Sequence, residues 1–466
     1  MKKLAENKFD LLIIGGGPGG YSTAIAAAKE GLSVALFEAA TLGGTCLNVG
    51  CIPTKYLLDK AAAIEKVRSL TNRKIFKEAG FYSFRKIQTG REEVVKKLTT
   101  GVEYLLKANK VTLIRGNASL CKRGRVRCGN TEYEGENIII ATGSEAVRLP
   151  IPGAEYTITS TEALALEKVP EKLVVIGGGV IGMELASAFC SFGSEVTVIE
   201  VLPELFMSED RKAVHYMKKE LEKRDIHILC KTKVEAVKMN EKGKYEVYYA
   251  SVDEEEAGVV MADKVLMAAG RKPSLRGIDA RALGLQLGVK GEIVTDVHMR
   301  TNVPHTYAIG DVVGGYQLAH VAYAEGEAAV SHILGRGEMV DLSVVPRCIY
   351  TIPAFAAVGI TEKEAKEQGI ETNIGNFAYS GNGMALAEGA EGMVQVLMDK
   401  NEQTTLGIQI VGECAPEMIA FASLAVKNKM TLTEWENLVV AHPSLTEMIK
   451  EAACDCFGKS IHGVVK

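Results

Sequence analysis

The segment Phe9-Asp-Leu-Leu-Ile-Ile-Gly-Gly-Gly-Pro-Gly-Gly20 passes from a short apolar run directly into a glycine-rich turn. An apolar run of this length predicts a buried strand, and the glycines predict a tight turn. A helix is expected next over Tyr21–Lys29, followed by a second apolar run, Ser33–Glu38, that ends in an acidic residue. This strand–turn–helix–strand order is the full context that a dinucleotide-binding fingerprint requires.

The same pattern occurs a second time further along the chain. Four positions recur at one constant offset, and the matching pairs are Gly15 and Gly177, Gly17 and Gly179, Gly20 and Gly182, and Glu38 and Glu200. One such glycine motif is weak evidence, whereas two complete copies predict two cofactor sites. The glycines let the backbone approach a pyrophosphate at the positive end of the helix. Each closing glutamate can accept hydrogen bonds from ribose hydroxyls.

Three more segments fit the plan of an α/β protein that binds cofactors. Asn137–Ser144, Lys264–Arg271 and Thr306–Asp311 each read as an apolar strand that ends in small residues or an aspartate. Ligands bind at the carboxyl ends of strands in open α/β sheets.

From about Asp341 the chain changes character. Strands expected at Ile349–Ile352, Met393–Met398 and Thr405–Val411 alternate there with amphipathic helices, without a glycine fingerprint. This part therefore reads as a separate α+β domain.

The whole-chain composition excludes several classes. The 466 residues suggest about three domains. A formal net charge of −4 argues against a nucleic-acid partner. The first apolar run, Leu11–Ile14, is too short for a signal peptide or a membrane span, and no organelle leader is apparent, so we expect a cytoplasmic protein. In the cytoplasm, ten cysteines should mostly be reduced, and a disulfide would be catalytic.

Cys46 and Cys51 stand five residues apart just after the first fingerprint unit. In a regular helix this spacing separates Cα atoms by roughly 8–9 Å, whereas a disulfide needs less than about 7 Å. The pair can close only where the helix is distorted, and Gly50 and Pro53 favour such a distortion. A regular helix is expected over Tyr56–Val67. Two inert buried thiols are the alternative, but the position of the pair just after a cofactor unit favours a labile redox pair. A helix N-terminus also lowers the pKa of a nearby thiol, which favours the reactive thiolate.

Together these motifs resemble the FAD-dependent pyridine nucleotide-disulfide oxidoreductases. The resemblance runs from end to end, through both fingerprints, the cysteine segment, Ala141-Thr-Gly143, Gly310-Asp311 and the C-terminal region. It implies an α/β fold with two Rossmann-like dinucleotide-binding domains plus a C-terminal α+β dimerisation domain. The expected divisions are 1–145 and 271–340 for the two parts of the FAD-binding domain, 146–270 for the NAD-binding domain and 341–466 for the dimerisation domain.

The resemblance implies FAD at the first fingerprint, the nicotinamide cofactor at the second, and no metal. The cofactor-binding residues that it implies are Gly15, Gly17, Pro18, Gly20, Glu38, Gly44, Thr45, Lys55, Ala141, Thr142, Gly143, Gly177, Gly179, Ile181, Gly182, Glu200, Gly270, Arg271, Gly310, Asp311, Leu318, Ala319 and His320. NAD rather than NADP follows from Glu200, because a carboxylate repels a 2′-phosphate and no arginine occurs before Arg211.

Within the family, Leu318–Gly326 and Ala441–Glu447 are most similar to the members that oxidise protein-bound dihydrolipoamide with NAD. That resemblance makes Cys46 the thiol that exchanges with substrate and turns Cys51 toward the flavin. His442 would be the acid–base catalyst, oriented by a carboxylate and reaching the cysteines of the other subunit. An imidazole has a pKa suited to that task near neutrality, and Glu447 can fix its tautomer.

The remaining implied catalytic residues are Lys55 and Glu184, which match a family ion pair beside the flavin. The implied partners are a second copy of the chain and a lipoyl-bearing protein of a 2-oxo acid dehydrogenase, acetoin or glycine cleavage system, among which the sequence does not choose. No nucleic-acid or membrane partner is expected.

Three alternatives stay open at this point. A mercuric reductase shares the fold and would prefer NADPH and a C-terminal cysteine pair, which Cys454 and Cys456 nominally offer. Their one-residue separation argues instead for small apolar helix positions. Another low-molecular-weight disulfide reductase is disfavoured by Glu200. A non-catalytic binding scaffold would not need the intact cysteine pair with His442.

Overall fold

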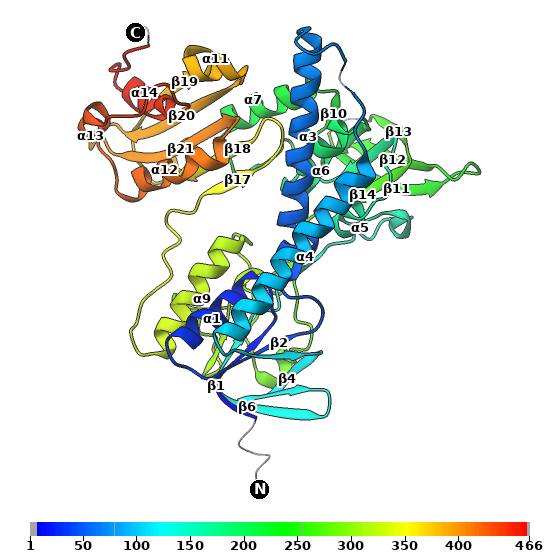
Figure 1. Cartoon of the computed structure of the whole chain (residues 1–466), viewed down its shortest axis with the longest axis vertical. Helices are drawn as coiled ribbons and strands as arrows, with labels where there is room; N and C mark the ends of the chain where they lie inside the picture. The colour runs from blue at the N-terminus through cyan, green and yellow to red at the C-terminus, as the bar shows by residue number, and fades with distance from the viewer. Residues whose placement is uncertain (1–6, 79, 254, 464–466) are drawn as a thin grey trace.

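A computed structural model describes residues 7–78, 80–253 and 255–463, which fold into three units (Figure 1). The first unit is built on a seven-stranded sheet in which strand β16 also pairs with β6. In sheet order its strands are β3 (Thr112–Arg115), β2 (Val34–Glu38), β1 (Lys8–Ile14), β6 (Thr131–Ile140), β5 (Arg125–Cys128) and β4 (Ala118–Lys122), with β16 (Thr306–Ala308) beside β6. Helices α1 (Pro18–Lys29) and α9 (Ala319–Ile333) pack against each other at this sheet (Figure 1).

The second unit repeats the arrangement of the first. Its parallel sheet consists, in order, of β10 (Ile226–Leu229), β9 (Glu195–Ile199), β8 (Lys172–Ile176) and β14 (Lys264–Met267). Helix α6 (Val180–Ser191) follows the second glycine turn as α1 follows the first, and α7 (Arg211–Glu222) precedes β10. An antiparallel sheet of β11 (Thr232–Met239), β12 (Tyr245–Ser251) and β13 (Ala257–Ala262) is added to this unit.

Two short strands connect the first and second units. Strands β7 (Ser144–Ala146) and β15 (Arg271–Pro273) pair antiparallel, so the chain enters and leaves the second unit side by side. The expected divisions at 145 and 270 fall at this strand pair; the domain boundaries themselves stay predictions.

The third unit carries a five-stranded antiparallel sheet. Its order is β17 (Arg347–Ile349), β18 (Phe355–Gly359), β21 (Thr405–Gly412), β20 (Gly392–Asp399) and β19 (Thr372–Ala378). Helices α12 (Ala415–Lys427) and α14 (Glu447–Asp455) pack on it, and α13 (Leu432–Asn437) lies beside α14.

The strand expected at Ile349–Ile352 is wrong in position, because β17 covers Arg347–Ile349. Two backbone amides beyond β17 bind side chains of α6 instead of a neighbouring strand. The amide of Tyr350 donates to Glu184, and the amide of Ile352 donates to Ser187.

Two long helices, α3 (Cys51–Asn72) and α4 (Phe84–Ala108), extend from the first unit to the second (Figure 1). One apolar cluster contains Leu57 of α3, Phe189 of α6 and Phe355 of β18, so side chains from all three units share a core. Burial of this apolar surface holds the units against one another. No helix in the described ranges is long and apolar enough to cross a membrane.

Candidate functional site

A cavity of about 2000 Å³ lies where the three units meet. Both glycine turns, both cysteines of the expected redox pair and strand β17 line it. Every cofactor-binding residue expected from the sequence lines this cavity except Gly20, Gly182 and His320. One continuous space therefore connects the two expected cofactor sites.

The two glycine turns have matching geometry. Gly15 and Gly177 both have φ of +107°, a backbone conformation that disfavours any side chain. A Cβ on Gly20 would lie 1.8 Å from the Gly15 carbonyl oxygen, and one on Gly182 would lie 2.1 Å from that of Gly177. Gly20 and Gly182 thus let each helix pack closely on its strand, which explains why they stand behind the cavity wall.

Glu38 and Glu200 are held in the same way at the two turns. Each carboxylate accepts two backbone amides, from Gly16 at 2.8 Å and Ala40 at 2.6 Å for Glu38, and from Gly178 at 2.6 Å and Leu202 at 2.8 Å for Glu200. Both are about nine-tenths buried, and both line the cavity. A carboxylate has about four acceptor sites, so each retains capacity for a ribose hydroxyl. The residues present thus fit an adenine dinucleotide at each turn.

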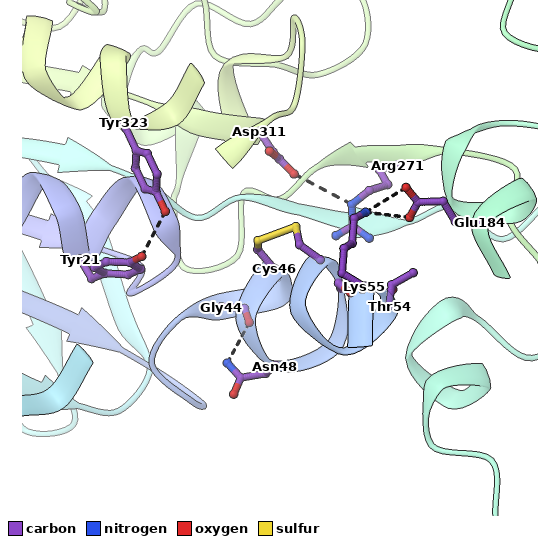
Figure 2. Close-up of a disulfide and its surroundings, with 12 residues drawn as sticks. Tyr21, Gly44, Cys46, Asn48, Thr54, Lys55, Glu184, Arg271, Asp311 and Tyr323 are labelled. Carbon is purple, nitrogen blue, oxygen red and sulfur yellow. Dashed lines mark hydrogen bonds and ion pairs between the residues drawn. A yellow bond between two sulfur atoms is a disulfide. The ribbon is translucent and has the colours of Figure 1, made fainter. Parts of the chain in front are cut away.

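Cys46 and Cys51 form a disulfide with Cα atoms 4.6 Å apart (Figure 2). Helix α2 (Gly44–Val49) ends before Gly50, and α3 begins at Cys51. The backbone of Gly50, at φ −143° and ψ −111°, makes the break between the helices. The distortion expected from the sequence is therefore confirmed, but helix α3 already begins at Cys51 rather than near Tyr56. Cys51 therefore stands at the N-terminus of α3, where the helix dipole favours negative charge.

Lys55 and Glu184 form an ion pair where α3, α6 and the end of β17 meet (Figure 2). Lys55 Nζ lies 2.9 and 2.8 Å from the two carboxylate oxygens of Glu184. Only 4% of the Glu184 side chain is exposed, and its Oε1 also accepts the amide of Tyr350 at 2.9 Å. Lys55 Nζ lies 4.5 Å from the centre of the Tyr350 ring. Contacts among α3, α6 and Tyr350 consequently fix the pair in the cavity wall.

Asp311 belongs to a polar network that the sequence did not reveal completely. Ser144 donates its hydroxyl to Asp311, while Arg271 Nε donates to the Ser144 hydroxyl at 2.7 Å. Burial lowers the pKa of Arg271, and the charge of Asp311 opposes this shift. Next to Asp311, the amide of Gly310 donates to Glu325 of α9 at 2.6 Å. Burial raises the pKa of Glu325 to about 7. Ser144 was missed because its partners Asp311 and Arg271 are 167 and 127 positions away, and Glu325 was missed because no motif marks its bond to Gly310.

Near the disulfide, α1 and α9 bring two tyrosine hydroxyls together (Figure 2). The oxygens of Tyr21 and Tyr323 lie 3.1 Å apart, and burial raises the pKa of Tyr21. No sequence motif indicated this pair, since its members are 302 positions apart.

His442 and Glu447 lie in the third unit, between α13 and the start of α14. His442 Nδ1 lies 2.8 Å from Glu447 Oε1, and the other carboxylate oxygen accepts the amide of Ser444 at 2.9 Å. Burial opposes ionisation of Glu447, but these bonds more than offset it, and its pKa is lowered. The His442 side chain is 78% exposed and does not line the cavity of its own chain. Cys454 and Cys456 are buried in the core of the same unit, as small apolar residues would be.

The cofactor and catalytic roles of the expected site residues, His320 included, stay predictions. The ring nitrogen Nε2 of His320 lies 3.0 Å from the carbonyl oxygen of Pro346, at the approach to β17.

Two dinucleotide-binding units with a disulfide in the cavity between them define a dinucleotide-dependent disulfide oxidoreductase. The chain belongs to the pyridine nucleotide-disulphide oxidoreductase family, whose profile matches residues 9–326, and the dimerisation domain of that family matches residues 345–453. The chain is accordingly an enzyme whose family uses FAD and a nicotinamide nucleotide.

Similar proteins cover nearly the whole length of the chain. It is 37% identical to the dihydrolipoyl dehydrogenase of Bacillus subtilis over 461 residues, covering 97% of this chain and 99% of that protein. It is 38% identical to the mitochondrial dihydrolipoyl dehydrogenase 1 of Arabidopsis thaliana, covering 97% and 91%. Among solved structures, a copper(II) complex of the HOCl-induced flavoprotein disulfide reductase RclA of Escherichia coli superposes with a TM-score of 0.86 at 28% identity, covering 96% and 99%.

Proposed function

We propose that the chain is a dihydrolipoyl dehydrogenase, which oxidises protein-bound dihydrolipoamide to lipoamide and reduces NAD. The observation that carries this proposal is the Cys46–Cys51 disulfide, which lies in the cavity that joins both dinucleotide turns. The near full-length relatives that bear this name support the choice of substrate.

The first half of the reaction is thiol–disulfide exchange. One substrate thiol loses its proton, and its thiolate attacks Cys46 Sγ. The Cys46–Cys51 bond breaks, Cys51 leaves as a thiolate, and a mixed disulfide forms between Cys46 and the substrate. The second substrate thiolate then attacks the substrate sulfur of the mixed disulfide. It displaces Cys46 and closes the lipoamide ring, so two electrons pass to the cysteine pair.

His442 takes the protons in this scheme. Glu447 holds Nδ1 of the imidazole, so Nε2 is the ring nitrogen that would accept the protons, and the carboxylate charge stabilises the imidazolium that forms. Because His442 is exposed on the unit that matches the dimerisation domain, we place it against the Cys46 of a second copy in a homodimer.

The helix that follows the disulfide and the Lys55–Glu184 pair supply further electrostatic stabilisation. The N-terminus of α3 stabilises the Cys51 thiolate that exchange produces. Lys55, fixed by Glu184, places a positive charge beside the cavity between the two turns. The flavin, when bound at the first turn, supplies the two-electron chemistry between the cysteines and the nicotinamide nucleotide.

The choice of NAD rests on Glu200. A carboxylate buried at this turn repels a 2′-phosphate, and Arg211, the first arginine after it, begins α7 and does not line the cavity. We further propose a cytoplasmic enzyme that serves a lipoyl-bearing protein of a 2-oxo acid dehydrogenase, acetoin or glycine cleavage system. Among the cysteines that the structure describes, seven besides Cys46 and Cys51 form no disulfide, as expected of a protein in a reducing compartment.

Steady-state turnover tests this proposal. The purified flavin-loaded protein should reduce NAD with dihydrolipoamide, with kcat/KM for NAD far above that for NADP. A Cys46→Ser variant should retain flavin and lose this turnover. Oxidation of NADPH that depends on mercuric ion, without turnover of dihydrolipoamide, would support the mercuric reductase alternative instead.

A further inference from the structure

Arg347 and Glu209 form an ion pair in the cavity wall that no step above uses. Arg347 Nε and Nη2 donate to the two carboxylate oxygens of Glu209 at 2.8 and 3.0 Å. The side chains are only 19% and 6% exposed, and both line the cavity. Glu209 belongs to the second unit, and Arg347 belongs to β17 of the third. The pair therefore joins two units at the cavity wall.

The chain neighbours of the pair connect it with the second glycine turn and with the Lys55–Glu184 pair. Cys348, next to Arg347, also lines the cavity, and Tyr350 donates its amide to Glu184 beside Lys55. Glu209 lies near the end of the loop 201–210, which begins directly after Glu200 at the second glycine turn. Residues of this loop and of β17 thus line the same cavity as the second glycine turn.

Stability does not by itself explain a buried ion pair here. Removing two charges from water costs several kcal/mol per ion, and apolar residues of similar volume are often as stable. Burial lowers the pKa of Arg347, but the bond to Glu209 outweighs burial and raises it, so the guanidinium stays charged. A guanidinium fork matches phosphate oxygens as well as it matches a carboxylate. Arg347 is consequently equipped to exchange Glu209 for an anionic ligand.

We propose that Arg347 is a dinucleotide-binding residue supplied by the third unit. Its guanidinium binds phosphate or ribose oxygens in the nicotinamide half of NAD, and Glu209 holds it in the cavity wall until the nucleotide enters. The nucleotide then competes with Glu209 for the guanidinium. This inference deepens the proposed function and rests on its dependence on NAD.

Calorimetric titration of the oxidised, flavin-loaded protein with NAD, ADP-ribose and AMP tests the proposal. AMP has the adenosine half that Glu200 would hold but lacks the other half of the dinucleotide. Arg347→Met should raise the Kd for NAD and ADP-ribose about tenfold or more, because a charged hydrogen bond is lost, and leave the Kd for AMP within twofold. Arg347→Lys, which keeps the charge but not the fork, should give an intermediate Kd. Glu209→Gln removes the competitor and should lower the Kd for NAD.

A matched control separates ligand binding from a tether between units. Lys212 Nζ lies 2.6 Å from Asn376 Oδ1 and joins the same two units, but neither residue lines the cavity. Lys212→Gln should leave every Kd unchanged, and flavin content and unfolding temperature verify that each variant folds.

A Kd for NAD within twofold of wild type in Arg347→Met would overturn the inference. An equal rise in Arg347→Met and Glu209→Gln would do so too, because it would identify a structural tether. Absence of NAD binding to the wild-type protein would overturn the proposed function as well, so the two failures are distinguishable.

Discussion

Gly179→Ala should weaken nucleotide binding at the second cofactor site without disturbing the fold. Gly179 precedes α6 with φ −76° and ψ −179°, values that alanine adopts freely. A Cβ there would meet no atom within 4 Å, and Gly179 lines the cavity. The methyl group would therefore occupy space that a nucleotide needs, and the unfolding temperature should stay close to that of wild type.

The size of the effect follows from contact distances. A backbone amide binds a phosphate oxygen at about 2.9 Å, whereas a methyl carbon needs about 3.5–4.0 Å to its neighbours. The phosphate must retreat by roughly 0.5–1 Å and lose at least one charged hydrogen bond, worth about 1.5–3 kcal/mol. The Kd for NAD should rise about 10- to 150-fold.

Calorimetric titration with NAD measures this change, and the ratio of flavin to protein absorbance should match wild type. Gly182→Ala is the structural contrast, because its Cβ would lie 2.1 Å from the Gly177 carbonyl oxygen and should destabilise the second unit itself. Gly101→Ala in α4, where a Cβ meets nothing within 4 Å, should alter neither property. Wild-type affinity for NAD in Gly179→Ala would refute a nucleotide site at the second turn.

Three more outcomes are expected. Glu447→Gln should lower kcat with dihydrolipoamide about 100-fold at unchanged flavin content, because the proton acceptor His442 loses its orienting charge; unchanged steady-state kinetics would contradict this. Burial raises the pKa of Glu325 from 4.5 to about 7, so the wild type loses stability as pH rises through that range. In scanning calorimetry, the unfolding temperature of Glu325→Gln should therefore rise relative to that of wild type between pH 5 and pH 8. A difference in unfolding temperature that does not change with pH would refute the conclusion that burial disfavours ionised Glu325. Co-assembled Cys46→Ser and His442→Gln subunits should recover about a quarter of wild-type turnover, since mixed dimers keep one complete site; no recovery would place each site within one chain.

The sequence predicted the features whose geometry is local. Gly15 and Gly177 adopt φ of +107°, which favours glycine. Gly20 and Gly182 lie against a carbonyl oxygen, where a side chain would not fit. The turn therefore requires glycine at these positions, and the glycine motif predicts the turn. Likewise, Gly50 interrupts the helix that would otherwise hold Cys46 and Cys51 apart, and the disulfide follows.

Features formed by distant segments could not be predicted in this way. Arg347 meets Glu209 from 138 positions away, and Tyr323 meets Tyr21 only because α9 packs on α1. The strand predicted at Ile349–Ile352 was misplaced for the same reason, because side chains of α6 accept hydrogen bonds from the backbone amides beyond β17. The sequence pattern of a strand does not specify which distant side chain will accept a hydrogen bond from its backbone amides.

The most direct test of the disulfide relay is a stopped-flow absorbance experiment in which dihydrolipoamide is mixed with the oxidised yellow protein, followed by addition of NAD or NADP. We expect rapid reduction with a long-wavelength band from a Cys51 thiolate beside the flavin, and reoxidation by NAD in strong preference to NADP. A protein that NADH reduces but dihydrolipoamide does not would retain the flavin and the fold but contradict the proposed substrate.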